Sequence, residues 1–226
     1  MKEIFEKYGI EISEEKREKF EKYYQLLVEY NQKFNLTAIT EKKEVYIKHF
    51  IDSLLCIKKI GCGKMIDIGS GGGFPALPIK IMRDDLDVTL LEATGKKCIF
   101  LNAVINELGL KNARVINGRA EDFAKDFKYR ESFDICTARA VARLNTLCEY
   151  TLPFVKVGGT FIAFKGDVTE ELKEGENSIN VLGGKCEFVD NLYLDDAKRD
   201  IVFIKKIKAT PSKYPRGNGK ERKNPL

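Results

Sequence analysis

An aspartate and a group of glycines between residues 67 and 73 have the spacing most suggestive of chemistry. The segment 64–75 begins as a short apolar run with β-branched residues and then passes into four glycines, at positions 69, 71, 72 and 73. A short apolar run bounded by breakers is typical of a buried parallel strand, and glycine permits positive φ and close approach of a ligand. Pro75 and Pro78 suit the first turn of a helix. The segment therefore predicts a strand, a glycine loop and a helix N-terminus, where open α/β sheets bind cofactors.

The glycine spacing narrows the choice of cofactor. A dinucleotide fingerprint, G-x-G-x-x-G, counted from Gly69 would need glycine where Phe74 stands. The observed pattern, Asp67-x-Gly69-x-Gly71-x-Gly73, resembles the first motif of S-adenosylmethionine-dependent methyltransferases, in which the loop runs beside the amino-acid part of the cofactor. A tight turn in another α/β domain remains an alternative, and an NAD-dependent oxidoreductase is disfavoured but not excluded.

A second predicted strand, Val88–Glu92, ends in a carboxylate. Glu92 follows Gly73 by nineteen residues, close to the ~20-residue offset at which an acidic residue reaches a ribose hydroxyl. A carboxylate can accept both hydrogen bonds of a vicinal diol, so we expect Glu92 to bind a nucleoside. It could instead lie beside a helix N-cap without contacting a ligand.

Length and composition limit the class of protein. The chain has 226 residues with 43% hydrophobic content, enough for one large domain with an extension. It contains no apolar run of membrane-spanning length, no signal-peptide core in its first residues, and six cysteines without C-x-x-C spacing. With a single histidine, His49, it offers little for a zinc site. We therefore expect a cytoplasmic protein with free thiols, no metal and no membrane contact.

The net charge of +5 is distributed unevenly. Residues 205–226 carry eight Lys or Arg and one acid, which is +7, so residues 1–204 sum to −2. Clustered cations interspersed with Pro and Gly predict a flexible arm that binds a polyanion. On this interpretation, deleting residues 209–226 weakens binding to RNA and leaves cofactor affinity nearly intact.

Periodicity predicts an α/β fold in three parts. Helices are expected at 13–34, with Ser13 as N-cap, and at about 44–59, forming a helical cap over residues 1–60. Residues 61–208 alternate strands and helices, with strands near 64–69, 87–92, 113–117, 132–138, 159–165, 186–193 and 200–207. Five parallel strands closed by an antiparallel pair make a doubly wound, Rossmann-like sheet of about seven strands, the class I methyltransferase arrangement. Residues 209–226 form the basic C-terminal tail.

The residues after the fourth strand bear on the methyl acceptor. Thr137-Ala138-Arg139-Ala140 lacks the acid/Asn-Pro-Pro-aromatic tetrad usual in enzymes that methylate amino groups of bases. Cys136 lies inside the strand and is better placed for the core than for nucleophilic attack. Guanine N7 fits, because its lone pair is free at neutral pH and no base has to remove a proton.

Several short motifs together resemble the bacterial 16S rRNA guanine-N7 methyltransferase family (RsmG, also called GidB). They are Asn31-Gln-Lys-Phe-Asn-Leu-Thr37, Lys48-His49 with Asp52-Ser53-Leu54, the glycine loop through Pro75, Arg119-Ala120-Glu121, Arg139-Ala140, Phe164-Lys165-Gly166 and the tail Tyr214-Pro-Arg…Asn224-Pro-Leu226. The resemblance covers nearly the whole chain and implies methylation of guanine 527 in the 530 loop. One departure is Gly72, where many relatives have proline.

The resemblance also implies site residues. Cofactor contacts would fall on Gly69, Phe74, Ala120-Glu121 and Arg139, while Asp67, Gly71, Gly73 and Glu92 follow from the general methyltransferase pattern. Arg139 would pair with the methionine carboxylate or with an RNA phosphate, and Lys165 would meet the RNA backbone or be an ordinary surface lysine. His49 is expected to hydrogen-bond with Asp52 or the Asn35 loop. No residue is assigned as catalytic.

The expected partner is 16S rRNA or the 30S particle, bound by a monomer. Two other functions remain open on the sequence alone. A methyltransferase for a small molecule or a protein would share the glycine loop and Glu92 but leave the basic tail unexplained. An RNA-binding protein with a vestigial nucleotide pocket would keep the same motifs and transfer no methyl group.

Overall fold

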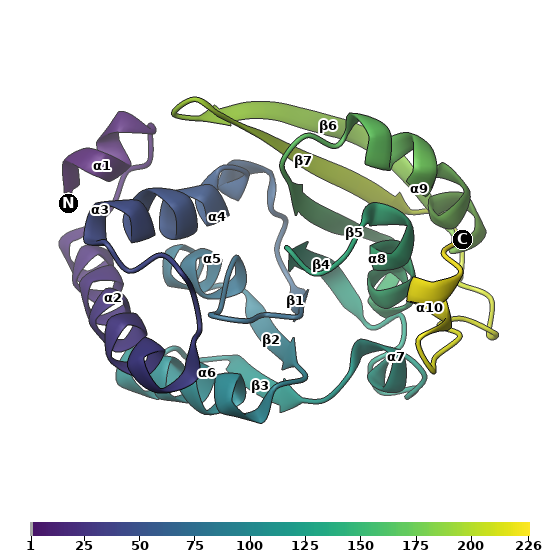
Figure 1. The fold of residues 1–226 in the computed structure, drawn as a ribbon, viewed down its shortest axis with the longest axis horizontal. Helices are drawn as coiled ribbons and strands as arrows, with labels where there is room; N and C mark the ends of the chain where they lie inside the picture. Colours follow the sequence, from purple (N-terminus) through teal and green to yellow (C-terminus); the bar gives the residue numbers. More distant parts are fainter. Residues whose placement is uncertain (1) are drawn as a thin grey trace.

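The computed structural model describes residues 2–226, so that Met1, the first residue of the predicted cap, lies outside the described part. Its centre is one seven-stranded sheet in the order β3-β2-β1-β4-β5-β7-β6 (Figure 1). The strands are β1 (Lys64–Ile68), β2 (Asp87–Glu92), β3 (Ala113–Asn117), β4 (Phe133–Arg139), β5 (Val155–Lys165), β6 (Gly184–Leu194) and β7 (Ala197–Lys206). Strands β1 to β5 are parallel, and β7 is antiparallel to both β5 and β6. The predicted Rossmann-like class I methyltransferase fold is confirmed.

Helices cover both faces of the sheet. The helices between strands are α5 (Ala76–Met82), α6 (Gly95–Glu107), α7 (Ala120–Phe123), α8 (Leu144–Thr151) and α9 (Thr169–Val181). Successive strand residues point to opposite faces, so Met65 and Leu90 join a core with α5, α6 and the N-terminal helices. Ile66 and Leu91 join a second core with α8 and α9. Because β1 is paired in parallel with β2 on one side and with β4 on the other, the carboxyl ends of these three strands lie together at one edge of the sheet.

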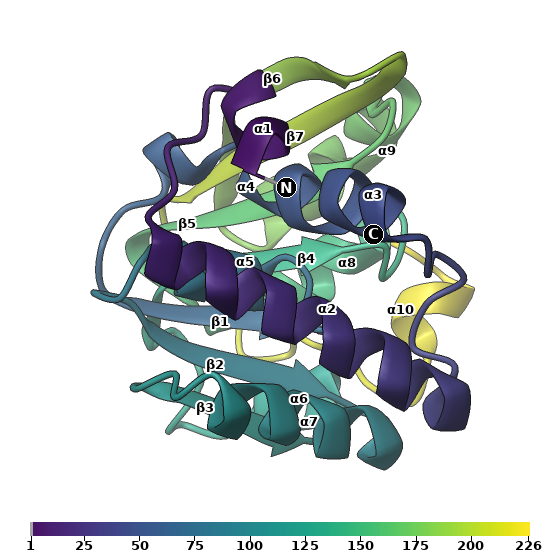
Figure 2. The ribbon, with the colours of Figure 1, turned by 90° about the vertical axis from the view of Figure 1, so that its left-hand side faces the viewer.

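The N-terminal cap differs in part from its prediction. Helix α2 (Glu14–Phe34) begins as expected, with the Ser13 hydroxyl accepting from the Lys16 amide, and Figure 2 shows it running across β1 and β2. A further helix, α1 (Lys2–Lys7), was not predicted. The single helix expected at 44–59 is instead α3 (Lys42–Val45), a π-helical turn (Tyr46–Ile51), α4 (Asp52–Leu54) and a 3₁₀ turn (Ile57–Lys59). Five of the six residues in the π turn are buried, more than one face of a regular helix could bury.

The C-terminal segment is packed, which corrects the prediction of a flexible arm. Tyr214 and Glu221 are buried, and Arg216 forms an ion pair with the buried carboxylate of Glu149, 2.7 Å from Nη2 to Oε2. The short helix α10 (Lys220–Lys223) lies beside α8, with the chain end near α9 (Figure 1). The prediction failed because charge counting ignores the acids that the cations meet in the fold.

Candidate active site

The glycine loop makes the turn that its sequence predicts. Gly69, Gly71 and Gly73 have φ of +69°, +56° and +90°, a region that side chains rarely adopt. A Cβ on Gly69 would lie 2.8 Å from the Val141 side chain, and one on Gly73 would lie 2.5 Å from the Tyr23 hydroxyl oxygen. The loop amide of Gly69 donates to Leu91 O at 2.8 Å. Glycine is therefore required here both for backbone conformation and for close packing.

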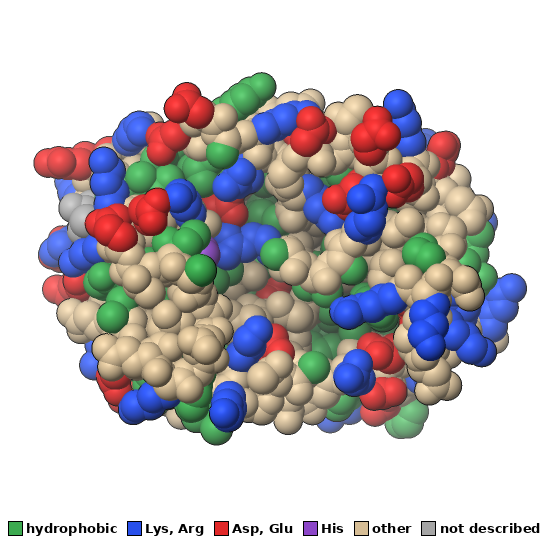
Figure 3. Space-filling view, viewed as in Figure 1, with side chains coloured by type: hydrophobic (Ala, Val, Ile, Leu, Met, Phe, Trp, Pro, Cys, Tyr) green, Lys and Arg blue, Asp and Glu red, His purple; other side chains and the backbone are tan. Residues whose placement is uncertain are grey.

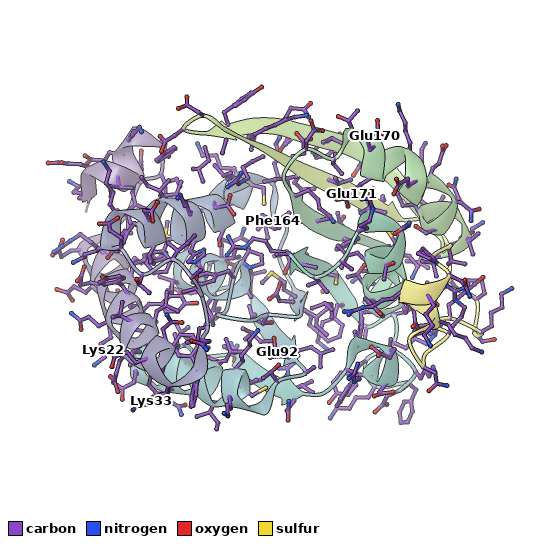
Figure 4. All side chains as sticks on the ribbon, in the orientation of Figure 1. Lys22, Lys33, Glu92, Phe164, Glu170 and Glu171 are labelled. Atoms are coloured by element: carbon purple, nitrogen blue, oxygen red, sulfur yellow. The ribbon has the colours of Figure 1, made fainter. Side chains whose placement is uncertain are left out.

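Glu92 holds the loop from the end of β2, where Figure 4 labels it. Its Oε2 accepts from the Gly71 amide and its Oε1 from the Thr94 amide, both at 2.8 Å, and the residue is 6% exposed. Each bond uses one lone pair of an oxygen, so each carboxylate oxygen retains further acceptor capacity. The carboxylate borders a cavity, and its remaining capacity suits the two hydroxyls of a ribose.

That cavity, which we call the cofactor cavity, has a volume of about 400 Å³. Its lining comes from the ends of β1 and β2, the start of α7, the loop after β4, helix α8 and the C-terminal segment. The lining residues are Ile68, Gly69, Leu91, Glu92, Ala93, Gly118, Arg119, Ala120, Glu121, Val141, Tyr150, Gly219 and Arg222. Of the predicted cofactor residues, Gly69, Glu92, Ala120 and Glu121 are brought together here.

Asp67 lies buried beneath the loop, at 1% exposure. Its Oδ1 accepts from the Thr137 hydroxyl at 2.7 Å, while its Oδ2 is buried without a hydrogen-bond partner in the described chain. Burial raises the pKa of this carboxyl to about 7, against hydrogen bonds from Thr137 and Ser70 that lower it. An unpaired acceptor beside the glycine loop fits the amino group of an amino-acid moiety, such as that of S-adenosylmethionine.

Phe74 is placed by an aromatic stack behind the loop. Its ring lies between those of His49, at 4.5 Å between centroids, and Tyr23, at 5.5 Å. The Arg139 guanidinium carbon lies 5.1 Å from the Phe74 centroid. The Tyr23 hydroxyl also donates to Gly72 O at 2.5 Å. The Phe74 side chain therefore connects the glycine loop to the N-terminal cap, and it does not line the cofactor cavity.

Arg139, at the end of β4, belongs to a charged cluster with the cap. Its Nη1 donates to Asp52 Oδ2 at 2.7 Å, and Asp52 Oδ1 accepts from Arg199 Nε at 2.6 Å. The Arg139 Nη2 lies 3.2 Å from His49 Nδ1, and His49 Nε2 lies 2.9 Å from the Thr37 hydroxyl. Burial, reinforced by the Arg139 charge, lowers the pKa of His49 to about 4, so its ring is neutral at pH 7.

This cluster forms one wall of a second cavity of about 480 Å³, which we call the basic cavity. Its charged lining residues are Lys48, Asp52, Arg139, Lys165, Glu171 and Arg199. Arg139 and Arg199 share Asp52, Lys165 pairs with Glu171, and Lys48 pairs with Glu44 beside the cavity, so that four cations meet three carboxylates and the wall keeps a small positive excess. Figure 4 labels two lining residues of this cavity, Phe164 on β5 and Glu171 on α9, which lie above Glu92 in that view. Figure 3, in the same orientation, shows Lys and Arg side chains around a hollow near the centre of the molecule.

Lys165 is a positioned side chain rather than an ordinary surface lysine. Its ammonium donates to Ala142 O at 2.6 Å and to Glu171 Oε2 at 2.7 Å, and its side chain is 11% exposed. The same Glu171 oxygen accepts from the Leu144 amide at 2.8 Å. Lys165 therefore fixes the loop between β4 and α8, the strip of chain that separates the two cavities.

Sequence reasoning missed several lining residues. Val141 and Tyr150 in the cofactor cavity, and Arg199 in the basic cavity, carry no motif of their own. Asp52 stood in a recognised motif, but nothing local indicated that it would pair with two arginines. His49 was expected to bond with Asp52 or the Asn35 loop; its bond to Thr37, in that loop, confirms the second alternative, and Arg139 is a partner that the sequence did not indicate.

Two negative observations concern the described residues, 2–226. They contain no group of three or more His, Cys, Asp or Glu side chains arranged to hold a metal ion. No helix among them has the length and apolar character needed to cross a membrane.

Solved structures that share this fold include O-methyltransferases. An O-methyltransferase from Bacillus cereus in complex with SAH matches with a TM-score of 0.58 at 16% identity, covering 81% of this chain and 90% of the other. A putative O-methyltransferase from Klebsiella pneumoniae matches with a TM-score of 0.58 at 11% identity, covering 82% and 90%. The fold and the glycine loop after β1 are those of a class I methyltransferase.

The sequence comparisons then give the family. A family model described as GidB, rRNA small subunit methyltransferase G, matches residues 16–202. A relative from Clostridium perfringens named ribosomal RNA small subunit methyltransferase G is 47% identical, covering 100% of this chain and 97% of the relative. One of the same name from Thermoanaerobacter sp. is 50% identical, covering 92% and 90%. The chain belongs to this family, which methylates N7 of a guanine in 16S rRNA with S-adenosylmethionine as methyl donor. The family predicted from the sequence is confirmed.

Proposed function

We propose that the protein transfers the methyl group of S-adenosylmethionine to N7 of guanine 527, in the 530 loop of 16S rRNA. The observation that carries this proposal is the pairing of two cavities on either side of the segment 139–141: one bordered by Glu92 and the glycine loop, the other cationic. Methyl transfer from a sulfonium is an in-line displacement, so catalysis consists mainly of holding donor and acceptor side by side.

The cofactor cavity has a residue for each part of the donor. Glu92 accepts from the ribose hydroxyls, Ala120 and Glu121 flank the adenine, and the amino-acid end lies toward the glycine loop, beneath which the Asp67 carboxyl is buried. Bound there, the cofactor supplies an electrophilic methyl group. The support for these roles is the remaining acceptor capacity of Glu92 and the unpaired, buried Oδ2 of Asp67.

The basic cavity suits the target nucleotide. Its excess of cations favours the phosphates next to the target base. Arg139 is held in place by its ion pair with Asp52 and by the stacking of its guanidinium on the Phe74 ring. A-form RNA hides the N7 edge of guanine in its deep groove, so we expect the target in a loop or a locally opened segment. Because Arg139 lines the basic cavity, we assign it to binding the RNA and not the methionine carboxylate.

The chemistry needs no general base, because guanine N7 carries a free lone pair. His49, the one histidine in the chain, is neutral at pH 7 and held between Arg139 and Thr37, which suits a positioning role. We further propose a monomer that works in the cytoplasm, where ribosomal subunits are assembled, on 16S rRNA presented free or in the 30S particle.

The test is methyl transfer from labelled S-adenosylmethionine to unmethylated 16S rRNA and to 30S particles. The modified nucleotide is then mapped by reverse-transcription stops after borohydride and aniline treatment, which reports N7-methylguanine. We expect a single stop at guanine 527 and none on RNA carrying adenine there. A stop at another guanine would refute the position, and label without any stop would refute N7. Arg139→Lys, which keeps the charge but loses the planar fork, should reduce transfer while preserving cofactor binding.

A further inference from the structure

The C-terminal segment reaches the cofactor cavity. Gly219 and Arg222 line it together with Glu121 of α7 and Tyr150 of α8. Gly219 has φ of +72° and begins the short helix α10. The polypeptide wall at this end of the cavity thus comes from the last eight residues of the chain, some 150 residues from the glycine loop in sequence.

Two sets of contacts fix residues 210–216 in place. Arg130 donates to the backbone oxygens of Thr210 and Tyr214, each at 2.8 Å. The Arg216 amide and guanidinium donate to Glu149, whose side chain is 1% exposed. These contacts hold residues 210–216 against the end of the sheet core, and the remaining residues start from a fixed point.

Helix α10 has its own anchor. The Thr146 hydroxyl of α8 donates to Glu221 O at 3.1 Å, and the Glu221 carboxylate, fully buried, accepts from the Gly217 amide. Leu226 packs against the core that contains Leu144 and Leu147. Buried acceptors and an apolar chain end are features of a built wall, because a solvated tail would keep its carboxylate in water.

We propose that the segment 214–226 is part of the cofactor site, with Arg222 closing the adenosine end of the cavity. A guanidinium is planar and stacks on aromatic rings, and adenine offers such a ring beside Ala120 and Glu121. This inference rests on the proposed use of the cavity for S-adenosylmethionine. It reverses the sequence-based expectation that removing residues 209–226 leaves cofactor affinity intact.

The basic residues of the tail then have two roles. Arg216 is neutralised by Glu149 and Lys206 by Glu131, so both serve packing. Lys213 and Lys223 are exposed and remain available to RNA.

Calorimetric titration with S-adenosylhomocysteine tests the proposal on the full-length protein. Arg222→Ala removes the guanidinium at the cavity, and we expect roughly three- to tenfold weaker binding. Lys223→Ala removes the same charge from the exposed neighbouring residue and should leave the affinity unchanged. Because each variant removes one positive charge from neighbouring residues, a difference in affinity between them is not explained by charge alone.

Thr146→Val provides an independent variant that lines neither cavity. It removes the hydroxyl that holds Glu221 O and should weaken S-adenosylhomocysteine binding a few-fold, with a melting temperature that shows the fold intact. Wild-type affinity in both Arg222→Ala and Thr146→Val would overturn the proposal. Failure of the wild-type protein itself to bind S-adenosylhomocysteine would instead overturn the assignment of the cavity.

Discussion

Replacing Glu92 by Gln is the sharpest test of the cofactor site, because it changes one atom of a side chain with defined partners. Both carboxylate oxygens accept from backbone amides, Gly71 at Oε2 and Thr94 at Oε1. A glutamine has a single acceptor oxygen, so whichever way the amide turns, its NH₂ group faces a backbone N–H. One charge-assisted hydrogen bond is lost and a buried donor is left unpaired.

The magnitude follows from that loss. A hydrogen bond to a charged group contributes about 1.5–3 kcal/mol, so we expect the free energy of unfolding to fall by about that amount. If, as we propose, the ribose diol donates to the same carboxylate, losing one of its two acceptors costs a similar free energy in binding. That corresponds to roughly 10- to 150-fold weaker binding of S-adenosylhomocysteine.

Urea unfolding and calorimetric titration measure the two effects separately. Glu107→Gln is the control, because Glu107 carries the same carboxylate in an exposed ion pair with Lys22, with 53% of its side chain exposed. We expect no change in cofactor affinity and at most about 0.5 kcal/mol in stability from that variant. A Glu92→Gln protein that binds S-adenosylhomocysteine as tightly as the wild type would refute the proposed ribose contact.

Three further predictions concern the loop and its buried titratable groups. Gly73→Ala puts a Cβ 2.5 Å from the Tyr23 hydroxyl oxygen at φ +90°, and should lower the free energy of unfolding in urea by more than about 2 kcal/mol. The control is Gly9→Ala, at φ +66° with nothing within 4 Å of the new Cβ, which should lower it by only about 1 kcal/mol. Equal losses in the two variants would contradict the argument. The pKa of Asp67 is raised to about 7 from 3.8, so between these values the folded state holds a proton that the unfolded state has lost. The free energy of unfolding therefore falls as pH rises from about 4 through 7. Urea midpoints of Asp67→Asn over this pH range should not show this decrease. The pKa of His49 is lowered to about 4 from 6.5, so its contribution to the free energy of unfolding is complete above pH 6.5 and is lost as pH falls toward 4. Urea midpoints of His49→Asn that still showed this loss of stability at acid pH would disprove the assignment.

The two titrations oppose each other in the wild type. Between pH 4 and 6.5 the His49 contribution to stability rises with pH while the Asp67 contribution falls. The wild-type profile is therefore flatter over this interval than that of either single variant. Above pH 6.5 only the Asp67 contribution continues to change, so measurements at pH 6.5 and 8 isolate it.

The parts of the site that follow from local sequence were predictable. The strand–loop–helix at 64–82 and the acidic end of β2 are short segments whose apolar runs, glycines and terminal carboxylate follow one another along the chain and predict each element directly. Consecutive parallel strands with short crossovers then place the two ends side by side. The positions of Asp67, Gly69 and Glu92 could be predicted because all three lie on one βαβ unit, although Asp67 and Gly69 also contact Thr137 and Val141 outside it.

The remaining site residues depend on contacts between distant segments. Asp52 pairs with Arg139 and Arg199, which are 87 and 147 positions away in the chain. The family resemblance implied a cofactor contact for Phe74, yet its side chain packs with Tyr23 and His49 of the cap. A stack of this kind has no sequence period, because each member belongs to a different element.

The C-terminal segment shows why charge composition misleads when the partners are buried. A count of +7 over residues 205–226 describes the unfolded chain, in which every cation is solvated. In the fold, Lys206 is fully buried, donating to Glu131 and to the backbone oxygens of Leu152 and Val155. Moving a lysine from water to such a site is favourable only with these partners in place, so Lys206 and Arg216 act as anchors for the segment that follows. The cations that hold the tail in place are thus different from those that stay exposed to solvent, and a count of charges cannot separate the two groups.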